Sequence, residues 1–315
     1  MRRTIWFSLL LFLPLLKSSV AAGQACTTYV VVPAFDRVTH DPIENLQAQD
    51  FEARMGHASL PVLSANPNFT NRLLVLLEAD HAGDQNKVGE MVDLIVRMTR
   101  NAPEGKPVAF GIYATKSEFT TGFQADQKER TREINDVIER RSSLGNRVGL
   151  YDAMHAALAL FSHPQTGDTV LVIGDPVDDH SHHSPGDLIN EYTRRGIRVT
   201  IMPRQPINHV ERDYITNSHT QEKEFFEHIA AMTGGFYTDF KARWFQSPWQ
   251  GYLLAIQLPD GLSKPKSWNL RVRRSIELPH KANVFYPAKL GPCSGAVEAE
   301  NSRAPEEARP TVAEK

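Results

Sequence analysis

The spacing of hydrophobic residues changes several times along the chain, and each change predicts a different kind of element. The continuous apolar run at residues 73–77 is typical of a strand buried on both faces of a parallel sheet, and residues 169–173 predict another buried strand. Residues 107–114 and 198–202 predict two further strands. Five runs with apolar residues three and four positions apart predict helices, at residues 88–98, 133–141, 152–161, 184–192 and 225–230. Strands that alternate with helices predict a three-layer, Rossmann-like α/β fold with a mostly parallel central sheet.

The segments on either side of this alternation have a different pattern. Residues 23–66 predict short strands and turns, with a β-rich run at Tyr29–Val32, and residues 247–290 predict strands without helices between them, at 251–258, 268–272 and 284–286. We therefore expect an α/β domain over 67–246 and a small β module built from both flanks. Residues 291–315 contain hardly any apolar side chains, which predicts a disordered tail.

The first 22 residues predict a secretory signal peptide. Arg2 and Arg3 precede an apolar run from Ile5 to Leu16, and the small residues Val20–Ala22 follow. The alternatives are a single N-terminal anchor and lipidation at Cys26, although the leucine of a lipoprotein signal is missing before this cysteine. The sequence thus predicts an exported protein, periplasmic or secreted, that does not span the membrane once the leader is removed.

Composition adds two constraints. The net charge of -2 gives no reason to expect nucleic acid as a partner. The two cysteines, Cys26 and Cys293, lie at opposite ends of the expected folded region, where they either form one disulfide or stay unpaired. We expect the disulfide, because domain termini often lie close together and an exported protein meets oxidising conditions.

Acidic residues follow two of the predicted buried strands. Glu78 and Asp80 come at the end of the first strand, and Asp175 follows the strand at 169–173. Ligands of open α/β sheets bind beyond the carboxyl ends of the strands. If the two strands are neighbours, the three carboxylates converge, and their repulsion favours a bound cation such as Mg²⁺, a raised pKa or a nearby positive group.

Four segments resemble the von Willebrand factor type A (VWA) domain, and in particular the VWFA-related subfamily common in acidobacteria. The segment at 46–51 is similar to a Leu-Thr-x-x-Asp-Phe signature, and 149–154 is similar to Ala-Leu-Tyr-Asp-Ala-Leu. The segment at 174–179 stands where the family has Ser-Asp-Gly-x-Asp, and 229–235 resembles Leu-Ala-x-x-Thr-Gly-Gly. The resemblance extends over roughly residues 28–275 and implies a protein that binds other proteins, as in adhesion.

The resemblance also implies that the family's metal-ion-dependent adhesion site is incomplete. Glu78 stands at the position of its first Asp, Asp80 and Ala82 at its two Ser, Val148 at its Thr, and Asp175 at its last Asp. Ala82 and Val148 offer no side-chain oxygen, so we expect no bound metal and no cofactor. The second hypothesis is adhesion that depends on a divalent cation held in a rebuilt site by Glu78, Asp80 and Asp175.

The loop that follows Asp175 is rich in carboxylates and imidazoles. Asp178, Asp179, His180 and His182 could hold Zn²⁺ or another transition metal, or they could form a solvated loop ahead of a helix. No nucleophile elbow, phosphate-binding glycine loop or His-Glu-x-x-His motif is present in the sequence. We therefore predict a binding protein without catalytic residues, and an unrecognised metal-dependent hydrolase is the remaining alternative.

Overall fold

The structure is a computed structural model that describes residues 26–67, 71–79, 98, 102–203, 220–237, 249–273 and 280–291. The predicted signal peptide lies outside these residues, as do the predicted tail beyond Gly291 and most of the helix predicted at 88–98. Asp80, Ala82 and Cys293 also lie outside them.

A five-stranded sheet forms the centre of the α/β domain. Its strand order is β10 (Arg198–Met202), β9 (Thr169–Ile173), β6 (Leu73–Glu78), β7 (Val108–Tyr113) and β8 (Ser117–Phe119). The first four are parallel to one another and confirm the four strands predicted at 73–77, 107–114, 169–173 and 198–202. The short strand β8 was not predicted, and it pairs antiparallel with β7 at one edge.

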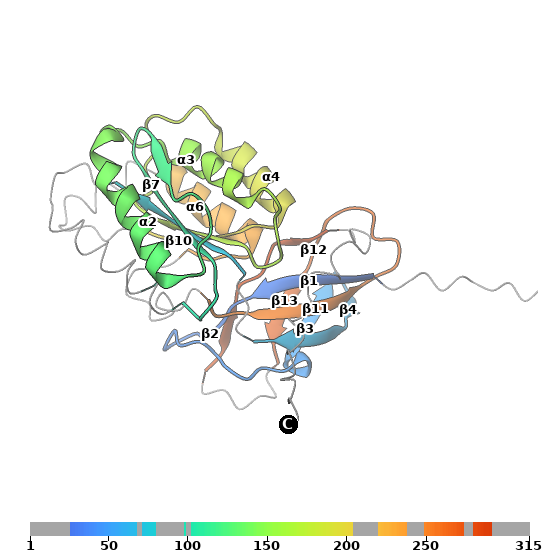
Figure 1. The fold of residues 1–315 in the computed structure, drawn as a ribbon. Helices are drawn as coiled ribbons and strands as arrows, with labels where there is room; N and C mark the ends of the chain where they lie inside the picture. The colour runs from blue at the N-terminus through green and yellow to red at the C-terminus, as the bar shows by residue number, and fades with distance from the viewer. Residues whose placement is uncertain are drawn as a thin grey trace, which may run out of the picture.

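Helices pack on both faces of this sheet (Figure 1). Alternate residues of a strand point to opposite faces, so Leu74 and Leu76 pack with residues of α3, α4 and α6, whereas Leu73 and Val75 pack with residues of α2. All six residues of β6 and all six of β7 are buried, as expected of strands covered on both sides. The sequence pattern predicted the burial of β6 because its residues 73–77 are all apolar, and Glu78 stands only at its end.

The described helices are α2 (Gln127–Glu139), α3 (Leu150–Ala157), α4 (Pro185–Arg195) and α6 (Thr220–Thr233), with 3-10 turns at Ala48–Asp50, Arg140–Ser143 and Leu158–Phe161. The predicted start of α2 at residue 133 was wrong, because Asp126 caps a polar first turn that carries no apolar signal. Ser184 caps α4 as its sequence predicted, accepting a hydrogen bond from the Asp187 backbone N–H. Gly234, with φ of +79°, follows the end of α6.

Strands from the two flanks of the chain pair with each other in the β module. One sheet joins β1 (Cys26–Val32), β11 (Tyr252–Leu258) and β5 (Val62–Asn66), and another joins β13 (Asn269–Val272), β3 (Phe51–Met55) and β4 (Ala58–Leu60). Two strand pairs complete it, β2 (Ala34–Asp36) with β14 (Ala282–Val284) and β12 (Lys266–Ser267) with β15 (Lys289–Leu290). The strand expected at 284–286 thus lies two residues earlier, since Val284 pairs with Ala34 and ends the ladder.

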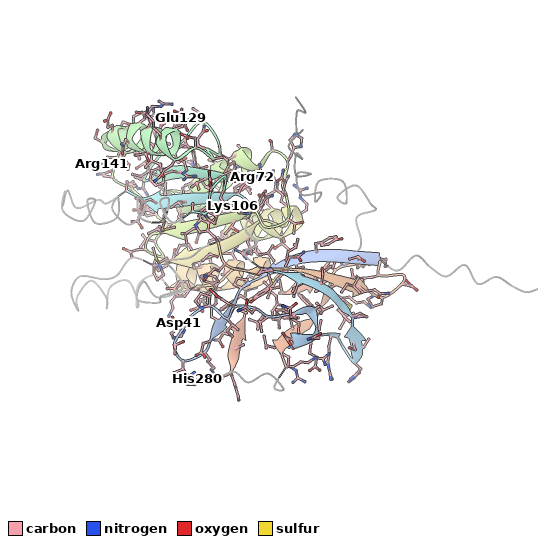
Figure 2. The ribbon with its side chains drawn as sticks, turned by 60° about the horizontal axis from the view of Figure 1, so that its bottom comes forward. Asp41, Arg72, Lys106, Glu129, Arg141 and His280 are labelled. Carbon is pink, nitrogen blue, oxygen red and sulfur yellow. The ribbon has the colours of Figure 1, made fainter. Side chains whose placement is uncertain are left out.

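The core of the β module is separate from the two clusters around the central sheet. It includes Phe51, Leu254, Ile256 and Trp268, all buried. Figure 2 shows the module beside the α/β domain, with Asp41 and His280 in the module and Arg72 and Lys106 in the α/β domain. Cys26, at the start of β1, is disulfide-bonded.

Within the described part of the chain, the helices are all too short or too polar to cross a lipid bilayer.

Candidate functional site

Two of the predicted acidic residues meet at the carboxyl ends of neighbouring strands. Glu78 is the last residue of β6, and Asp175 follows the end of β9, which lies next to β6 in the sheet. The Glu78 Oε2 atom accepts a hydrogen bond from the backbone N–H of Asp175 at 2.7 Å. Glu78 is 7% exposed and Asp175 is 3% exposed, so this contact is buried beneath the surface of the edge.

Gly174 allows this close approach. A Cβ atom added at Gly174 would lie 2.6 Å from the Tyr113 hydroxyl and 2.7 Å from Glu78 Oε2. Tyr113, the last residue of β7, is fully buried. The ends of β6, β7 and β9 therefore pack around a position that only glycine fits.

Val148 occupies the position where the resemblance implies a threonine ligand. Its backbone N–H donates to the Asp179 carboxylate at 2.8 Å, and its carbonyl accepts from the Asp179 N–H at 3.0 Å. Its apolar side chain is buried in the core beside α3, so it brings no oxygen to the edge. No group of three or more metal-binding side chains is found among the described residues, which do not include Asp80 and Ala82.

The acidic residues of the loop after Asp175 hold that loop against the start of α3. The Asp178 Oδ1 atom accepts from the Ser181 hydroxyl at 2.6 Å and from the Tyr151 backbone N–H at 3.4 Å. The Ser181 hydroxyl in turn accepts from the Asp152 N–H at 3.0 Å. Since a helix leaves its first N–H groups without partners inside the helix, this loop acts as the cap of α3.

Asp152 binds the histidine-rich part of the same loop from the first turn of α3. Its carboxylate accepts the backbone N–H groups of His182 and His183 at 2.9 and 3.0 Å. The Nδ1 atoms of the two imidazoles lie 2.9 and 2.7 Å from the same carboxylate. Burial raises the pKa of Asp152, but the hydrogen bonds from His182 and His183 outweigh it and hold this pKa well below its usual range.

The outer side chains of this region face solvent. The exposed fractions are 81% for His182, 52% for Arg147, 51% for Asp179 and 41% for His183. The Arg147 guanidinium donates to the Asp179 backbone carbonyl. We call these four residues the strand-end rim.

Sequence reasoning named Asp178, Asp179, His180 and His182 as loop candidates, and the structure gives the two aspartates backbone partners around the start of α3. His180 contacts His182 edge to face, with ring centroids 5.8 Å apart. Asp152 was not singled out from the sequence. The signal that could have found it is an acidic residue in the first turn of a predicted helix, where carboxylates bind backbone N–H groups.

No protein family and no curated protein matches this sequence. Among solved structures, the chain is similar to the conserved hypothetical protein BatB from Bacteroides thetaiotaomicron (12% identity, TM-score 0.41, covering 55% of this chain and 92% of that one). It is also similar to manganese-loaded TRAP protein from Plasmodium vivax (12% identity, TM-score 0.40, covering 70% and 94%). A third similar structure is the SpRpn10 VWA domain (9% identity, TM-score 0.38, covering 57% and 94%). At these identities and scores, the similarity indicates nothing about what this chain binds.

Proposed function

We propose that this chain is an exported protein-binding module, with a three-layer VWA-like α/β domain that contacts its partner protein through the strand-end rim. The observation that carries the proposal is the contrast within the rim. Its side chains are exposed, while the Asp152 carboxylate accepts the backbone N–H groups of His182 and His183 and the Val148 carbonyl accepts that of Asp179. A surface that is already ordered loses less conformational entropy on binding than a flexible one.

The hydrogen bonds of the Ser181 hydroxyl favour a binding role over a catalytic one. Ser181 is the one serine between Asp175 and His183, and its hydroxyl donates to Asp178 while accepting the Asp152 N–H. Its hydrogen is therefore directed to a carboxylate that caps the helix, rather than to an imidazole that could act as a base. In the proposed role, Ser181 positions the loop.

The proposed contact needs no metal ion. Glu78 is engaged with the Asp175 backbone, and Val148 supplies no ligand atom. Calorimetric titration of the mature chain with Mg²⁺, Mn²⁺ and Zn²⁺ tests this part of the proposal, with Asp175→Ala and Asp80→Ala as variants. Binding heat that both substitutions abolish would replace the proposal by the cation-dependent alternative.

The rim itself is tested by site-specific cross-linking in the native cell envelope. A photoreactive amino acid placed at His182 should cross-link a partner protein. The same residue at Arg132, which is 58% exposed on α2, serves as the matched control and should not. The reversed pattern, or equal products from both positions, would refute the assignment of the rim.

An independent measurement uses the captured partner. The double variant Arg147→Ala/His182→Ala should weaken its affinity for the chain at least tenfold, since truncating a residue that carries the binding energy of an interface costs about 2 kcal/mol or more. Arg132→Ala should leave the affinity unchanged. Thermal melts of both variants separate a loss of affinity from a loss of stability, because His182 also contacts the Asp152 carboxylate and Arg147 also bonds the Asp179 carbonyl.

A further inference from the structure

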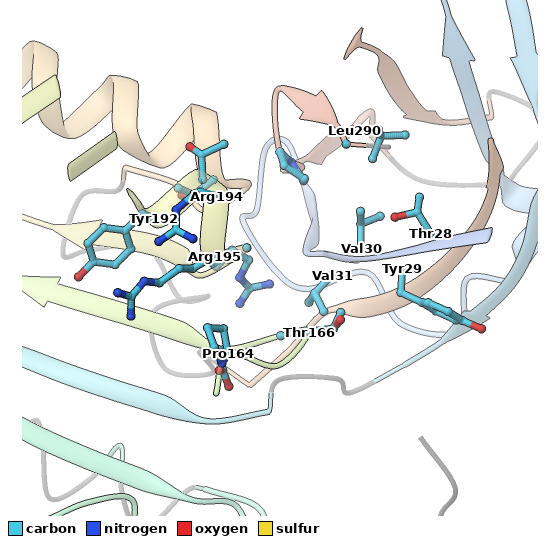
Figure 3. A pocket seen from close by; sticks show the side chains of 18 of the residues that line it. Thr28, Tyr29, Val30, Val31, Pro164, Thr166, Tyr192, Arg194, Arg195 and Leu290 are labelled. Carbon is cyan, nitrogen blue, oxygen red and sulfur yellow. The ribbon is translucent and has the colours of Figure 1, made fainter. Parts of the chain in front are cut away.

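A pocket lies at the opposite edge of the central sheet, where the α/β domain meets the β module. Its volume is about 260 Å³, and it is lined by residues of β1, by 164–168 ahead of β9, by the end of α4, by the start of β10 and by 287–291. Figure 3 shows Arg194 and Arg195 on one side of it and Thr28, Val30 and Leu290 on the other. We call it the junction pocket.

Arg198, the first residue of β10, lines this pocket with a buried guanidinium. The residue is 5% exposed, and its Nε and Nη1 atoms have no hydrogen-bond partner among the described residues. Burial lowers the pKa of Arg198 to about 10, which leaves it charged at neutral pH. A buried cation without a partner is strongly unfavourable, so its retention in a cavity wall points to a ligand that is absent from the protein alone.

Thr193 supplies a second polar group of the same kind. Thr193 lines the junction pocket, and its Oγ1 atom is buried and has no hydrogen-bond partner within the described parts of the chain. The neighbouring Thr233 differs, because its hydroxyl donates to the Ile229 carbonyl and accepts the Val199 N–H. Thr193 and Arg198 are therefore two residues of the pocket wall with polar atoms that the described parts of the fold leave without a hydrogen-bond partner.

The charges around the pocket are mainly positive. Arg194, Arg195, Arg198 and Lys289 line it, and the one carboxylate in its lining, that of Asp168, is paired with Arg72. Arg194 and Arg195 share the carboxylate of Glu191, each at 2.7 Å. With Arg72 included there are five cations, and the two carboxylates are those of Asp168 and Glu191, so about three positive charges remain in this region.

Two helix ends reduce this excess without cancelling it. The last turns of α4 and α6 both border the pocket, and the carbonyl end of a helix acts as roughly half a negative charge. The net charge facing the pocket is then about two positive charges. A phosphate group carries about 1.5 to 2 negative charges at pH 7, which matches this balance.

We propose that the junction pocket binds a small phosphate-bearing ligand, with Arg198 and Thr193 as its buried donors and Arg194 and Lys289 at its entrance. The volume supports a small ligand, since sites for drug-sized molecules span about 300–1,000 Å³. The ligand would contact both the α/β domain and the β module, because the pocket walls come from both. Phosphate binding would therefore fix the two parts of the protein against each other.

The test is thermal unfolding and calorimetric titration of the mature chain with inorganic phosphate and with glycerol phosphate. Phosphate at about a hundred times its Kd should raise the Tm by about 5 °C or more. Sodium chloride at matched ionic strength controls for charge screening. Tighter binding of glycerol phosphate would identify a phosphomonoester as the ligand, and equal or tighter binding of inorganic phosphate would identify the free anion.

Three substitutions localise the effect. Arg198→Met keeps the side-chain volume but removes the charge, and it should abolish the phosphate-dependent rise in Tm. Lys289→Ala changes an exposed residue of β15 and should weaken phosphate binding several-fold. Arg132→Met on α2 is the matched control and should leave the binding unchanged.

The proposal is overturned if phosphate causes no binding heat at concentrations up to about 10 mM, or if chloride produces the same rise in Tm. It is also overturned if Arg198→Met responds to phosphate as the wild type does. If Arg198→Met does not fold, the Lys289→Ala result decides, because unchanged phosphate affinity in that variant excludes the junction pocket.

Discussion

Replacing Gly174 by alanine should disrupt the packing beneath the strand-end rim. The added Cβ atom would lie 2.6 Å from the Tyr113 hydroxyl, 2.7 Å from Glu78 Oε2 and 2.9 Å from the Glu78 Cβ. Favourable contacts between carbon atoms are about 3.5–4.0 Å long. Tyr113 is fully buried and Glu78 is 7% exposed, so neither side chain can swing into solvent to make room.

The expected loss of stability follows from two contributions. Overfilling a packed core costs about 1–3 kcal/mol. Displacing the Glu78 carboxyl group also breaks its hydrogen bond to the Asp175 N–H, and a buried donor left without its partner costs about 1–3 kcal/mol. Because neighbouring effects are not additive, we expect Gly174→Ala to lower the free energy of unfolding by about 3 kcal/mol.

Urea denaturation at neutral pH measures this loss, and Gly186→Ala is the matched control. Gly186 lies in the first turn of α4, and the nearest atom to an added Cβ is the Ser184 hydroxyl at 4.0 Å. Alanine is a better helix former than glycine, so this variant should be as stable as the wild type or up to about 1 kcal/mol more stable. A Gly174→Ala variant within about 0.5 kcal/mol of the wild type would refute the reasoning.

A double-mutant cycle separates the steric part. Tyr113→Phe removes the hydroxyl that lies nearest to the added Cβ. In that background Gly174→Ala should cost about 1 kcal/mol less than in the wild type. An equal cost in both backgrounds would mean that Tyr113 does not restrict position 174.

Three further predictions concern charges and covalent links. Asp168→Ala should lower the free energy of unfolding by about 3–5 kcal/mol in urea, because it leaves Arg72 without its buried partner. Burial raises the pKa of Asp152, but the hydrogen bonds from His182 and His183 lower it by more, so the pKa in the folded state lies below the ordinary value. The ionised Asp152 therefore stabilises the folded protein fully above the ordinary pKa of about 3.9, and this stabilisation is lost as the pH falls towards the folded-state pKa. The difference in stability between wild type and Asp152→Asn, measured by thermal melts from about pH 7 to pH 3, should therefore shrink below about pH 4. Reduction of the Cys26 disulfide should lower stability by about 5 kcal/mol if it closes a loop to Cys293, and a change below about 1 kcal/mol would contradict that pairing.

The sequence predicted the central strands because burial on both faces leaves an unambiguous pattern. Leu73–Leu77 and Val170–Ile173 have no polar position that could indicate a helix or a half-exposed strand. The strand β8 left no such pattern, since its residues are all half-buried and it is only three residues long. The first turn of α2 was missed for a related reason: its polar residues carry no apolar periodicity.

The candidate site was predictable only in part. Neighbouring parallel strands bring their carboxyl ends to one edge, so the meeting of Glu78 and Asp175 follows from strand order. The partners of Asp178 and Asp179 do not, because each accepts from a backbone N–H about 30 positions away along the chain. The residue types alone indicated metal ligands at these positions. In the structure the two carboxylates instead accept the backbone N–H groups at the start of α3, which have no partner inside the helix.

The two edges of the central sheet reverse the usual expectation for an open α/β fold, in which ligands bind beyond the carboxyl ends of the strands. At that edge the acidic side chains bind backbone N–H groups of the same chain, as Glu78 does with Asp175 and Asp179 does with Val148. At the amino-terminal edge, Arg198 brings a charge into the protein that no described residue balances. A buried charge of this kind is tolerated when a bound molecule compensates it. We therefore expect a small ligand to bind where β10 begins and a partner protein to bind at the carboxyl edge.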